Sequence, residues 1–186
     1  MKLARAVIGS LLLAAAPLAA MAEGMSYSYV EADYVDVDVD NGPSGDGFGV
    51  RGSVGFAQNW LVFADYVDAS VDTIDIENIA VGIGGHYPVA SNLDAVGRIG
   101  YTEIDLSSGP FSASNDGYLL SLGLRGQMSQ FEAEGHIVYT DLSDGGDETA
   151  FEVAGRWNFT EMFSAGIAYR MSDDANVLFA GVRLSW

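Results

Sequence analysis

Residues Asn176 to Trp186 read N-V-L-F-A-G-V-R-L-S-W. Every second residue from Leu178 to Trp186 is apolar, whereas the opposite face includes Arg183 and Ser185. A period of two predicts a β-strand with two unlike faces. In transmembrane β-barrels these faces meet lipid on the outside and a polar lumen on the inside. The last eleven residues therefore predict a barrel strand, and the same alternation can be sought along the rest of the chain.

The N-terminus has the pattern of an export signal. Lys2 and Arg5 precede an apolar run over residues 6–18, and Ala20-Met21-Ala22 offers small residues at a cleavage site. This run is too short and wrongly flanked for a membrane anchor. We therefore expect a signal peptide over residues 1–22 and a mature domain over residues 23–186. An exported, strand-rich chain is either a soluble periplasmic β protein or a membrane barrel.

The composition narrows the classes of partner and chemistry. The formal net charge is −18, cysteine is absent, and the region after residue 22 contains six arginines and no lysine. So acidic a chain would be repelled by nucleic acid, which is therefore not expected as a partner. Without cysteine, neither a disulfide framework nor a thiol site is available. About half of the residues are hydrophobic, which disfavours disorder.

Apolar-striped segments alternate strictly with two kinds of connection. Short turns are followed by acidic, Gly- and Ser-rich loops, as in a hairpin meander across a membrane. This pattern predicts an all-β, antiparallel up-and-down transmembrane β-barrel of about ten strands, with both termini on the side of the short turns. Eight strands is the alternative. The predicted strands are 26–39, 48–56, 60–69, 76–87, 93–105, 116–126, 131–141, 149–157, 162–171 and 176–186.

The aromatic residues on the apolar faces form two predicted rings. Amphipathic rings at both headgroup levels are typical of membrane barrels, whereas a soluble sandwich or a lipocalin-like barrel would bury its aromatics in a core. The ring near the short turns contains Phe56, Trp60, Tyr87, Phe131, Trp157, Phe163 and Trp186. The ring near the loops contains Tyr34, Phe48, Tyr66, Tyr101, Tyr118, Tyr139, Phe151 and Tyr169.

The alternation places the charged residues of the predicted strands on the face that should point into the lumen. The planar guanidinium of arginine can bridge carboxylates from several strands, so we expect an ionic network that fills the interior. Four of its arginines should lie in the turn-side half, close in depth to Asp94, Glu132 and Glu134. A charged constriction of a narrow pore is the alternative. The predicted network comprises Arg51, Arg98, Arg125, Arg156, Arg183, Glu31, Asp65, Asp94, Glu132, Glu134 and Glu152, and Asp33 and Arg170 share its parity.

Candidate chemistry outside this network is weak. His86 and His136 both point inward, and no serine stands in an evident nucleophile context beside them. Asp36-Val37-Asp38-Val39-Asp40-Asn41-Gly42 begins like a calcium loop, but its glycine is one place late and Gly47 occupies the twelfth position. We expect no cofactor and no catalytic site. Weak divalent-cation binding at the acidic loops, tying them to anionic lipopolysaccharide, is the sharper alternative to loops that are merely solvated.

With these features in place, the chain resembles a known family. The segments that carry the likeness are Glu23-Gly24-Met25-Ser26-Tyr27-Ser28-Tyr29-Val30-Glu31, Phe63-Ala64-Asp65-Tyr66 and the closing aromatic strand. The family comprises small Gram-negative outer-membrane β-barrels once described as a sulfation-dependent quorum-sensing factor and elicitor of plant immunity. The resemblance implies that the barrel-assembly machinery reads the last strand, with Trp186 as its key residue. A sulfated peptide would need Tyr27 or Tyr29, both of which fall in the first predicted strand.

The sequence thus predicts a monomeric barrel of the cell outer membrane, surrounded by lipid and lipopolysaccharide. Its expected role is structural or in cell-surface interactions. A narrow porin-like channel for small solutes is the alternative, and an outer-membrane enzyme is a third hypothesis.

Overall fold

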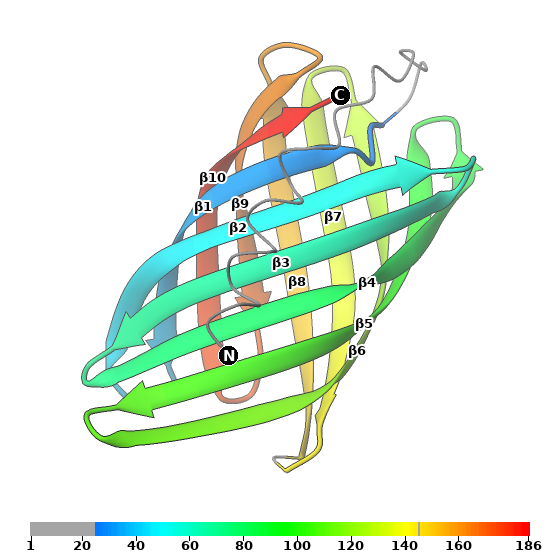
Figure 1. Ribbon diagram of the computed structural model, residues 1–186. Helices are drawn as coiled ribbons and strands as arrows, with labels where there is room; N and C mark the ends of the chain where they lie inside the picture. The colour runs from blue at the N-terminus through cyan, green and yellow to red at the C-terminus, as the bar shows by residue number, and fades with distance from the viewer. Residues whose placement is uncertain (1–24, 145) are drawn as a thin grey trace.

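The computed structural model describes residues 25–144 and 146–186, and they form one closed barrel of ten antiparallel strands (Figure 1). Each strand pairs with its neighbours in sequence, and β1 pairs with β10 to close the cylinder. The predicted fold class and the count of ten strands are confirmed, and the alternative of eight is wrong. The strands are β1 (Tyr29–Val39), β2 (Ser44–Phe56), β3 (Trp60–Val71), β4 (Ile74–Ala90), β5 (Leu93–Ser108), β6 (Phe111–Met128), β7 (Phe131–Leu142), β8 (Gly146–Asn158), β9 (Phe163–Met171) and β10 (Ala175–Ser185).

Strand boundaries differ from the prediction mainly at the loop end. The acidic loops are shorter than predicted, because β2, β4, β5, β6 and β8 continue into segments that the composition assigned to loops. Asp46 and Asp75 consequently lie on strands, in the parts that extend beyond the apolar belt. A strand outside a bilayer needs no apolar face, so the polar composition of these extensions concealed their pairing.

The start of β1 also differs from the prediction. The strand begins at Tyr29 rather than at residue 26, and residues 25–28 precede the ladder. The predicted signal peptide, residues 1–22, lies outside the described residues. Within residues 25–144 and 146–186, no helix is long and apolar enough to span a bilayer.

The two faces of each strand divide as the alternation predicts. Outward side chains such as Leu122 (72% exposed) and Ile167 (61% exposed) are apolar, although no protein covers them. Aromatic residues neighbour one another across strands near the loop end, where Tyr34 pairs with Phe48 and Tyr101 with Tyr118. A soluble protein rarely leaves so large a continuous apolar surface uncovered. The outer wall therefore has the character of a surface that faces lipid.

The wall bends sharply at the loop half of β2. A Cβ atom added at Gly45 or Gly47 would collide with the main chain of β3, and β1 and β3 come into contact across β2. This bend lets Val35 and Val37 of β1 pack with Ala69 and other inward residues in an apolar cluster. The loop half of the lumen therefore has an apolar lining on this side.

Candidate functional site: the filled lumen

The lumen contains a group of buried charged side chains from six strands. Glu31, Glu132, Arg125, Arg156 and Arg183 are each between 3% and 4% exposed. Isolated charges so far from solvent would be very costly, so their partners decide whether the group stabilises the barrel. We call the following residues the ionic layer: Glu31, Arg51, Arg125, Glu132, Glu134, Arg156 and Arg183.

Glu31 of β1 is one centre of the ionic layer. Its carboxylate lies 3.0 Å from Arg51 Nη2, 3.3 Å from Arg156 Nη2 and 2.6 Å from Arg183 Nη2. Register explains two of these contacts, because Glu31 stands directly opposite Arg51 on β2 and Arg183 on β10. Arg156 reaches the same carboxylate from β8, a strand that does not adjoin β1. The carboxylate therefore ties three other strands to β1.

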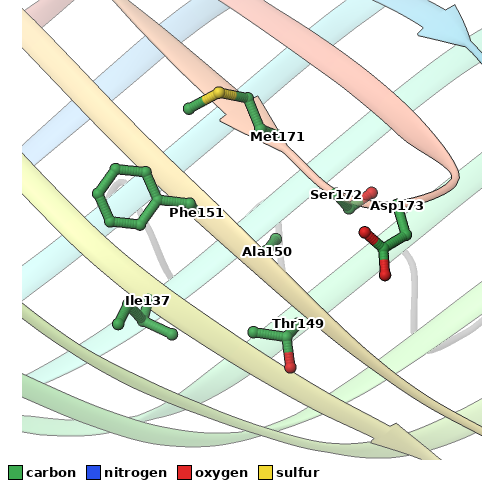
Figure 2. Close-up of a pocket in the computed structure, with 7 residues that line it drawn as sticks. All are labelled: Ile137, Thr149, Ala150, Phe151, Met171, Ser172 and Asp173. Atoms are coloured by element: carbon green, nitrogen blue, oxygen red, sulfur yellow. The ribbon is translucent and has the colours of Figure 1, made fainter.

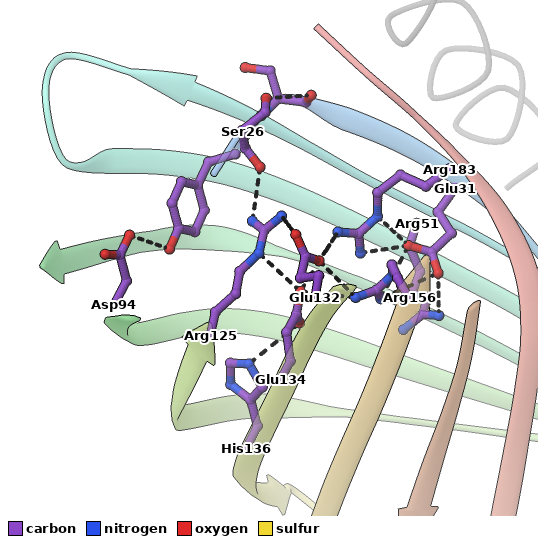
Figure 3. A network of polar contacts seen from close by, with 12 residues as sticks. Ser26, Glu31, Arg51, Asp94, Arg125, Glu132, Glu134, His136, Arg156 and Arg183 are labelled. Atoms are coloured by element: carbon purple, nitrogen blue, oxygen red, sulfur yellow. Dashed lines mark hydrogen bonds and ion pairs between the residues drawn. The ribbon is translucent and has the colours of Figure 1, made fainter. Parts of the chain in front are cut away.

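Glu132 and Glu134 of β7 form the second centre (Figure 3). Arg125 lies 2.7 Å from Glu132 and 3.2 Å from Glu134, and Arg156 lies 3.3 Å and 3.0 Å from the same two carboxylates. Arg183 reaches them at 3.4 Å and 3.7 Å. Arg156 and Arg183 thus link the β7 centre to Glu31. An alternating array of charges crosses the lumen from β2 to β6, with few hydrogen-bonding positions left empty.

A smaller set of charged groups adjoins the ionic layer. Arg51 also binds Asp33 at 3.0 Å and lies 3.7 Å from Glu152, which binds Arg170 at 2.8 Å. The Arg170 side chain is 42% exposed, the most of any arginine in an ion pair. This pair therefore marks the point where the closed network meets the open loop half of the lumen.

Three members of the predicted network lie elsewhere. Arg98 has no carboxylate within 4.0 Å, and no hydrogen bond to it is found in the described chain. Instead its guanidinium lies over the ring of Phe63, at 5.6 Å from the centroid. Asp65 likewise has no hydrogen bond or ion pair among the described residues, because its register partner Arg51 turns toward β1. Neither Arg98 nor Asp65, both predicted members of the network, forms an ion pair with the ionic layer.

Asp94 is the third exception. We expected it beside the turn-side arginines, but it accepts a hydrogen bond of 2.8 Å from the Tyr27 hydroxyl and lies 3.2 Å from His86 Nδ1. Figure 3 shows it well apart from the Arg–Glu cluster, with Arg125 between them. Although Asp94 and Arg125 are register partners, Arg125 turns toward β7. Two carboxylates on β7 attract this guanidinium more strongly than one on β5.

The group that sequence reasoning missed is the segment before β1. Residues Met25 to Ser28, which we call the strap, lie inside the turn-side mouth of the barrel. Arg125 Nη1 donates to the Ser26 carbonyl at 2.8 Å, and the Arg125 guanidinium lies 4.7 Å from the centre of the Tyr27 ring. The same ring stacks on His86 with centroids 3.8 Å apart. The strap is therefore held by an arginine, a histidine and a carboxylate at once.

The strap also joins the two ends of the barrel. The Trp186 amide donates to the Ser28 carbonyl at 3.1 Å, and the Ser26 hydroxyl donates to the Trp186 carbonyl at 2.9 Å. On the other side, the Gly55 amide donates to the Ser28 hydroxyl at 3.1 Å. The C-terminal residue, predicted to be an assembly signal, is therefore also a contact of the strap.

Tyr27 fills the part of the lumen that the ionic layer leaves uncovered. It packs in an apolar cluster with Leu61 and Phe63 of β3, Ala80 of β4 and Val96 of β5, and Met25 lies against the same cluster. None of these strands contributes a member of the ionic layer. The turn-side half of the lumen is thus filled by two sectors of opposite chemistry, one ionic and one apolar.

Aromatic rings inside the lumen support the guanidinium groups. Arg183 lies 3.7 Å above the Tyr29 ring, and Phe179 lies 4.8 Å from Arg51 and 5.8 Å from Arg170. A cation over a ring face is attracted by the quadrupole, more strongly when water is excluded. The sequence did contain a signal for this arrangement, because Tyr29 and Phe179 share the inward parity of Glu31 and Arg183.

One lumen cluster has the composition of a hydrolase site. The Ser121 hydroxyl lies 3.2 Å from His136 Nδ1, and His136 Nε2 lies 3.7 Å from Glu134. However, Ser121 and His136 are each only 6% exposed, so a substrate has no route to the hydroxyl. Glu134 is already bound by three arginines, so its carboxylate is engaged in the ionic layer rather than directed at the imidazole. The cluster therefore fits a packed lumen better than a nucleophilic site.

The outer wall has one notch near the loops, with a volume of about 320 Å³ (Figure 2). Its apolar side is formed by Ile137, Phe151 and Met171, and its polar side, at the β9–β10 loop, by Ser172 and Asp173. β8 continues past the end of β9 here, because Phe151 is the first β8 residue to pair with β9. The notch thus sits where an apolar wall gives way to a polar one.

Above the loop-side aromatics, carboxylates face outward on adjoining strands. Asp36 stands opposite Asp46, Glu77 opposite both Asp68 and Asp105, and Glu103 opposite Asp116. Like charges in such pairs are destabilising unless cations screen them. In the described part of the chain, however, no group of three or more potential ligands is close enough to hold a metal ion.

Comparisons with known proteins give only distant similarities. No protein-family model matches the chain, and no curated protein matches its sequence. Among solved structures it is similar to the KdgM porin in complex with disordered oligogalacturonate (12% identity, 86% of this chain and 99% of that chain, TM-score 0.49). It is also similar to the NanC porin (10% identity, 86% and 100%, TM-score 0.47) and to Ail, the attachment invasion locus protein of Yersinia pestis (15%, 87% and 100%, TM-score 0.39). Similarities of this size carry no information about the role of this chain.

The geometry of this chain itself defines its structural class. An apolar outer wall, a closed ladder and a charged interior are together the features of a ten-stranded transmembrane β-barrel.

Proposed function

We propose that this protein is a closed outer-membrane barrel that acts as a structural or surface-interaction element, and not as an open channel or an enzyme. The observation that carries the proposal is the filled cross-section of the turn-side lumen. Buried ion pairs occupy one sector, and the strap with its apolar neighbours occupies the other. A solute would have to displace groups that are only 3% to 6% exposed.

Export and assembly complete this proposal. Cleavage after Ala22 would deliver a chain that starts close to the strap, and the barrel-assembly machinery would read the last strand with Trp186 at its end. The barrel would work as a monomer, because its ladder closes on itself and leaves no edge for a second copy. Tyr27 and Tyr29 are 6% and 5% exposed inside the lumen, so neither is a suitable acceptor for a sulfate group.

The partners that we propose are outer-leaflet lipid and lipopolysaccharide. The apolar side of the notch would accept an acyl chain, with Ser172 and Asp173 at headgroup level. Divalent cations would bridge the outward carboxylates to the phosphates of lipopolysaccharide, because both surfaces are anionic. Calorimetric titration of calcium into the refolded barrel, with and without lipopolysaccharide in the bilayer, tests this contact. Absence of heat at millimolar calcium in both cases would rule it out.

Planar-bilayer recording on the refolded wild-type barrel tests the proposed closed state. The filled lumen predicts no stable conductance steps. A narrow porin-like channel is the second candidate, favoured by the exposed Arg170 above the ionic layer, and it predicts regular steps from the wild-type protein. Replacing His136 addresses the enzymatic hypothesis, which requires loss of an activity from a barrel that still folds.

A further inference from the structure

We propose that the strap is a removable closure, and that its release opens a passage for small hydrophilic solutes along the inner face of β3, β4 and β5. This inference rests on the proposed function, because it takes the wild-type lumen to be closed. It assigns the closure to one short segment and identifies the two charged residues that would control the ions passing through.

The sector of the lumen beside β3, β4 and β5 is filled partly by the wall and partly by the strap. Barrel-wall residues contribute Leu61, Phe63, Ala80 and Val96, whereas the strap contributes Tyr27 with Met25 beside it. The largest side chain of the strap therefore fills space that Ala80 of β4 and Val96 of β5 leave beside Leu61 and Phe63. A Cβ atom added at Gly84 would lie 2.9 Å from Leu61 and 3.1 Å from Arg98, so even the glycines of this wall are needed to make room.

The strap is attached to the barrel by contacts other than strand pairing. It is held by hydrogen bonds from Arg125, to Asp94 and around Ser26 and Ser28, by the packing of the Tyr27 ring between His86 and Arg125, and by the apolar burial of that ring. No ladder pairing holds residues 25–28, because β1 begins at Tyr29. A single hydrogen bond makes only a small net contribution, because its loss is largely compensated by hydrogen bonds to water. Release of the strap would therefore leave the pairing of β1 with β2 and β10 intact.

Two charged residues, Arg98 and Asp94, border this sector. Arg98 lies at the end of this sector that is nearer the loops, over the ring of Phe63. Its Nε atom is buried without a hydrogen-bond partner. The other five lumen arginines, Arg51, Arg125, Arg156, Arg170 and Arg183, all have carboxylates within 4.0 Å. A guanidinium without a protein acceptor leaves its donors available to a passing solute or to water. At the end nearer the short turns, Asp94 would lose the Tyr27 hydroxyl and keep His86 Nδ1, at 3.2 Å, as a neighbour.

The ionic layer would remain in place during this change. Arg125 would lose the Ser26 carbonyl but would keep Glu132 and Glu134 at 2.7 Å and 3.2 Å. The passage would therefore run between an intact ionic sector and the wall of β3, β4 and β5, with Arg98 and Asp94 at its two ends. Its width would be set by the space that Tyr27 and Met25 now occupy.

The test is single-channel recording in potassium chloride on the refolded full-length mature barrel and its variants. The Met25→Gly, Tyr27→Gly double variant removes the two large side chains of the strap and leaves the Ser26 carbonyl in place. We expect stable conductance steps from this variant and none from wild type. The matched control, Met25→Leu with Tyr27→Phe, retains the volume and should stay silent. Heat-dependent gel mobility shows that each variant is folded before it is recorded.

Ion preference then tests the two charges separately. In the open background, Arg98→Gln should shift the reversal potential in a salt gradient toward cation preference, and Asp94→Asn should shift it toward anion preference. A folded but silent double-glycine variant would overturn the closure, and steps unaffected by both charge variants would overturn the assigned route. Steps from wild type would instead contradict the proposed function, so the two failures are distinguishable.

Discussion

The two sectors of the turn-side lumen fill the same cross-section by different means. The ionic sector is built from side chains of β1, β2, β6, β7, β8 and β10, and each of its three carboxylates lies within 4.0 Å of three arginines. The apolar sector depends on the strap, a segment outside the ladder. Interlocked charges can be removed only at a high cost, because every partner left behind is a buried ion. The ionic sector would therefore persist for as long as the barrel is folded, whereas the strap of the apolar sector could leave the lumen of a folded barrel.

The largest expected difference between the sectors is in stability. Arg156→Met leaves Glu31, Glu132 and Glu134 with fewer cations, and we expect a loss of about 3–5 kcal/mol in the free energy of unfolding. Arg98→Met removes a guanidinium that lies over Phe63 but has no carboxylate within 4.0 Å, and we expect a smaller loss of about 0.5–2 kcal/mol. Urea titration of both barrels in lipid vesicles, followed by tryptophan fluorescence, measures the difference. Equal losses would show that Arg98 belongs to the ionic layer after all.

A smaller effect on stability is expected from adding a side-chain atom to the packed interior of the barrel. A Cβ atom at Gly123 would lie 2.5 Å from the His136 ring, whereas one at Gly135 would meet nothing within 4 Å. We therefore expect Gly123→Ala to destabilise the barrel by about 1–3 kcal/mol through overpacking.

Gly135→Ala is the matched control, because Gly135 belongs to the same strand pair but faces outward. Its expected effect is within about 0.5 kcal/mol in the same urea titration. Similar losses in the two variants would mean that Gly123 does not face a packed interior.

The smallest effect concerns the anchor of the strap. Tyr27→Phe removes only the hydrogen bond of 2.8 Å to Asp94, and we expect a loss of about 0.5–1.5 kcal/mol. Tyr29→Phe serves as the control, since no hydrogen bond of the Tyr29 hydroxyl is found among residues 25–144 and 146–186. If both variants unfold at the wild-type urea concentration, the Asp94 contact does not help to hold the strap.

Sequence alone predicted the parts of the molecule that repeat. The ten strands and the inward parity of Arg51, Arg125, Arg156 and Arg183 follow from alternation, because a bilayer tolerates only one arrangement of apolar and charged faces. The strand extensions past the apolar belt were not predictable in this way, since they lie outside the bilayer and carry no apolar stripe.

The pairing of the charges was predictable only in outline. Parity places Arg98 and Asp65 in the lumen, but it does not specify which way a long side chain turns. Arg125 binds β7 rather than its register partner Asp94, and Arg51 binds β1 rather than its register partner Asp65. The strap was missed for a different reason. Its alternation, Ser26-Tyr27-Ser28-Tyr29, continues that of β1, so no local signal separates a segment that pairs from one that turns inward.

The division of every strand into a lipid face and a lumen face underlies both sectors, and the native tryptophans test it most directly. Trp60 and Trp157 are 53% and 50% exposed on the outer wall, and Trp186→Phe leaves them as the only indoles. In vesicles with brominated acyl chains, we predict strong quenching of this variant's fluorescence, and little quenching by aqueous iodide. Strong iodide quenching without any effect of the brominated lipid would contradict the account.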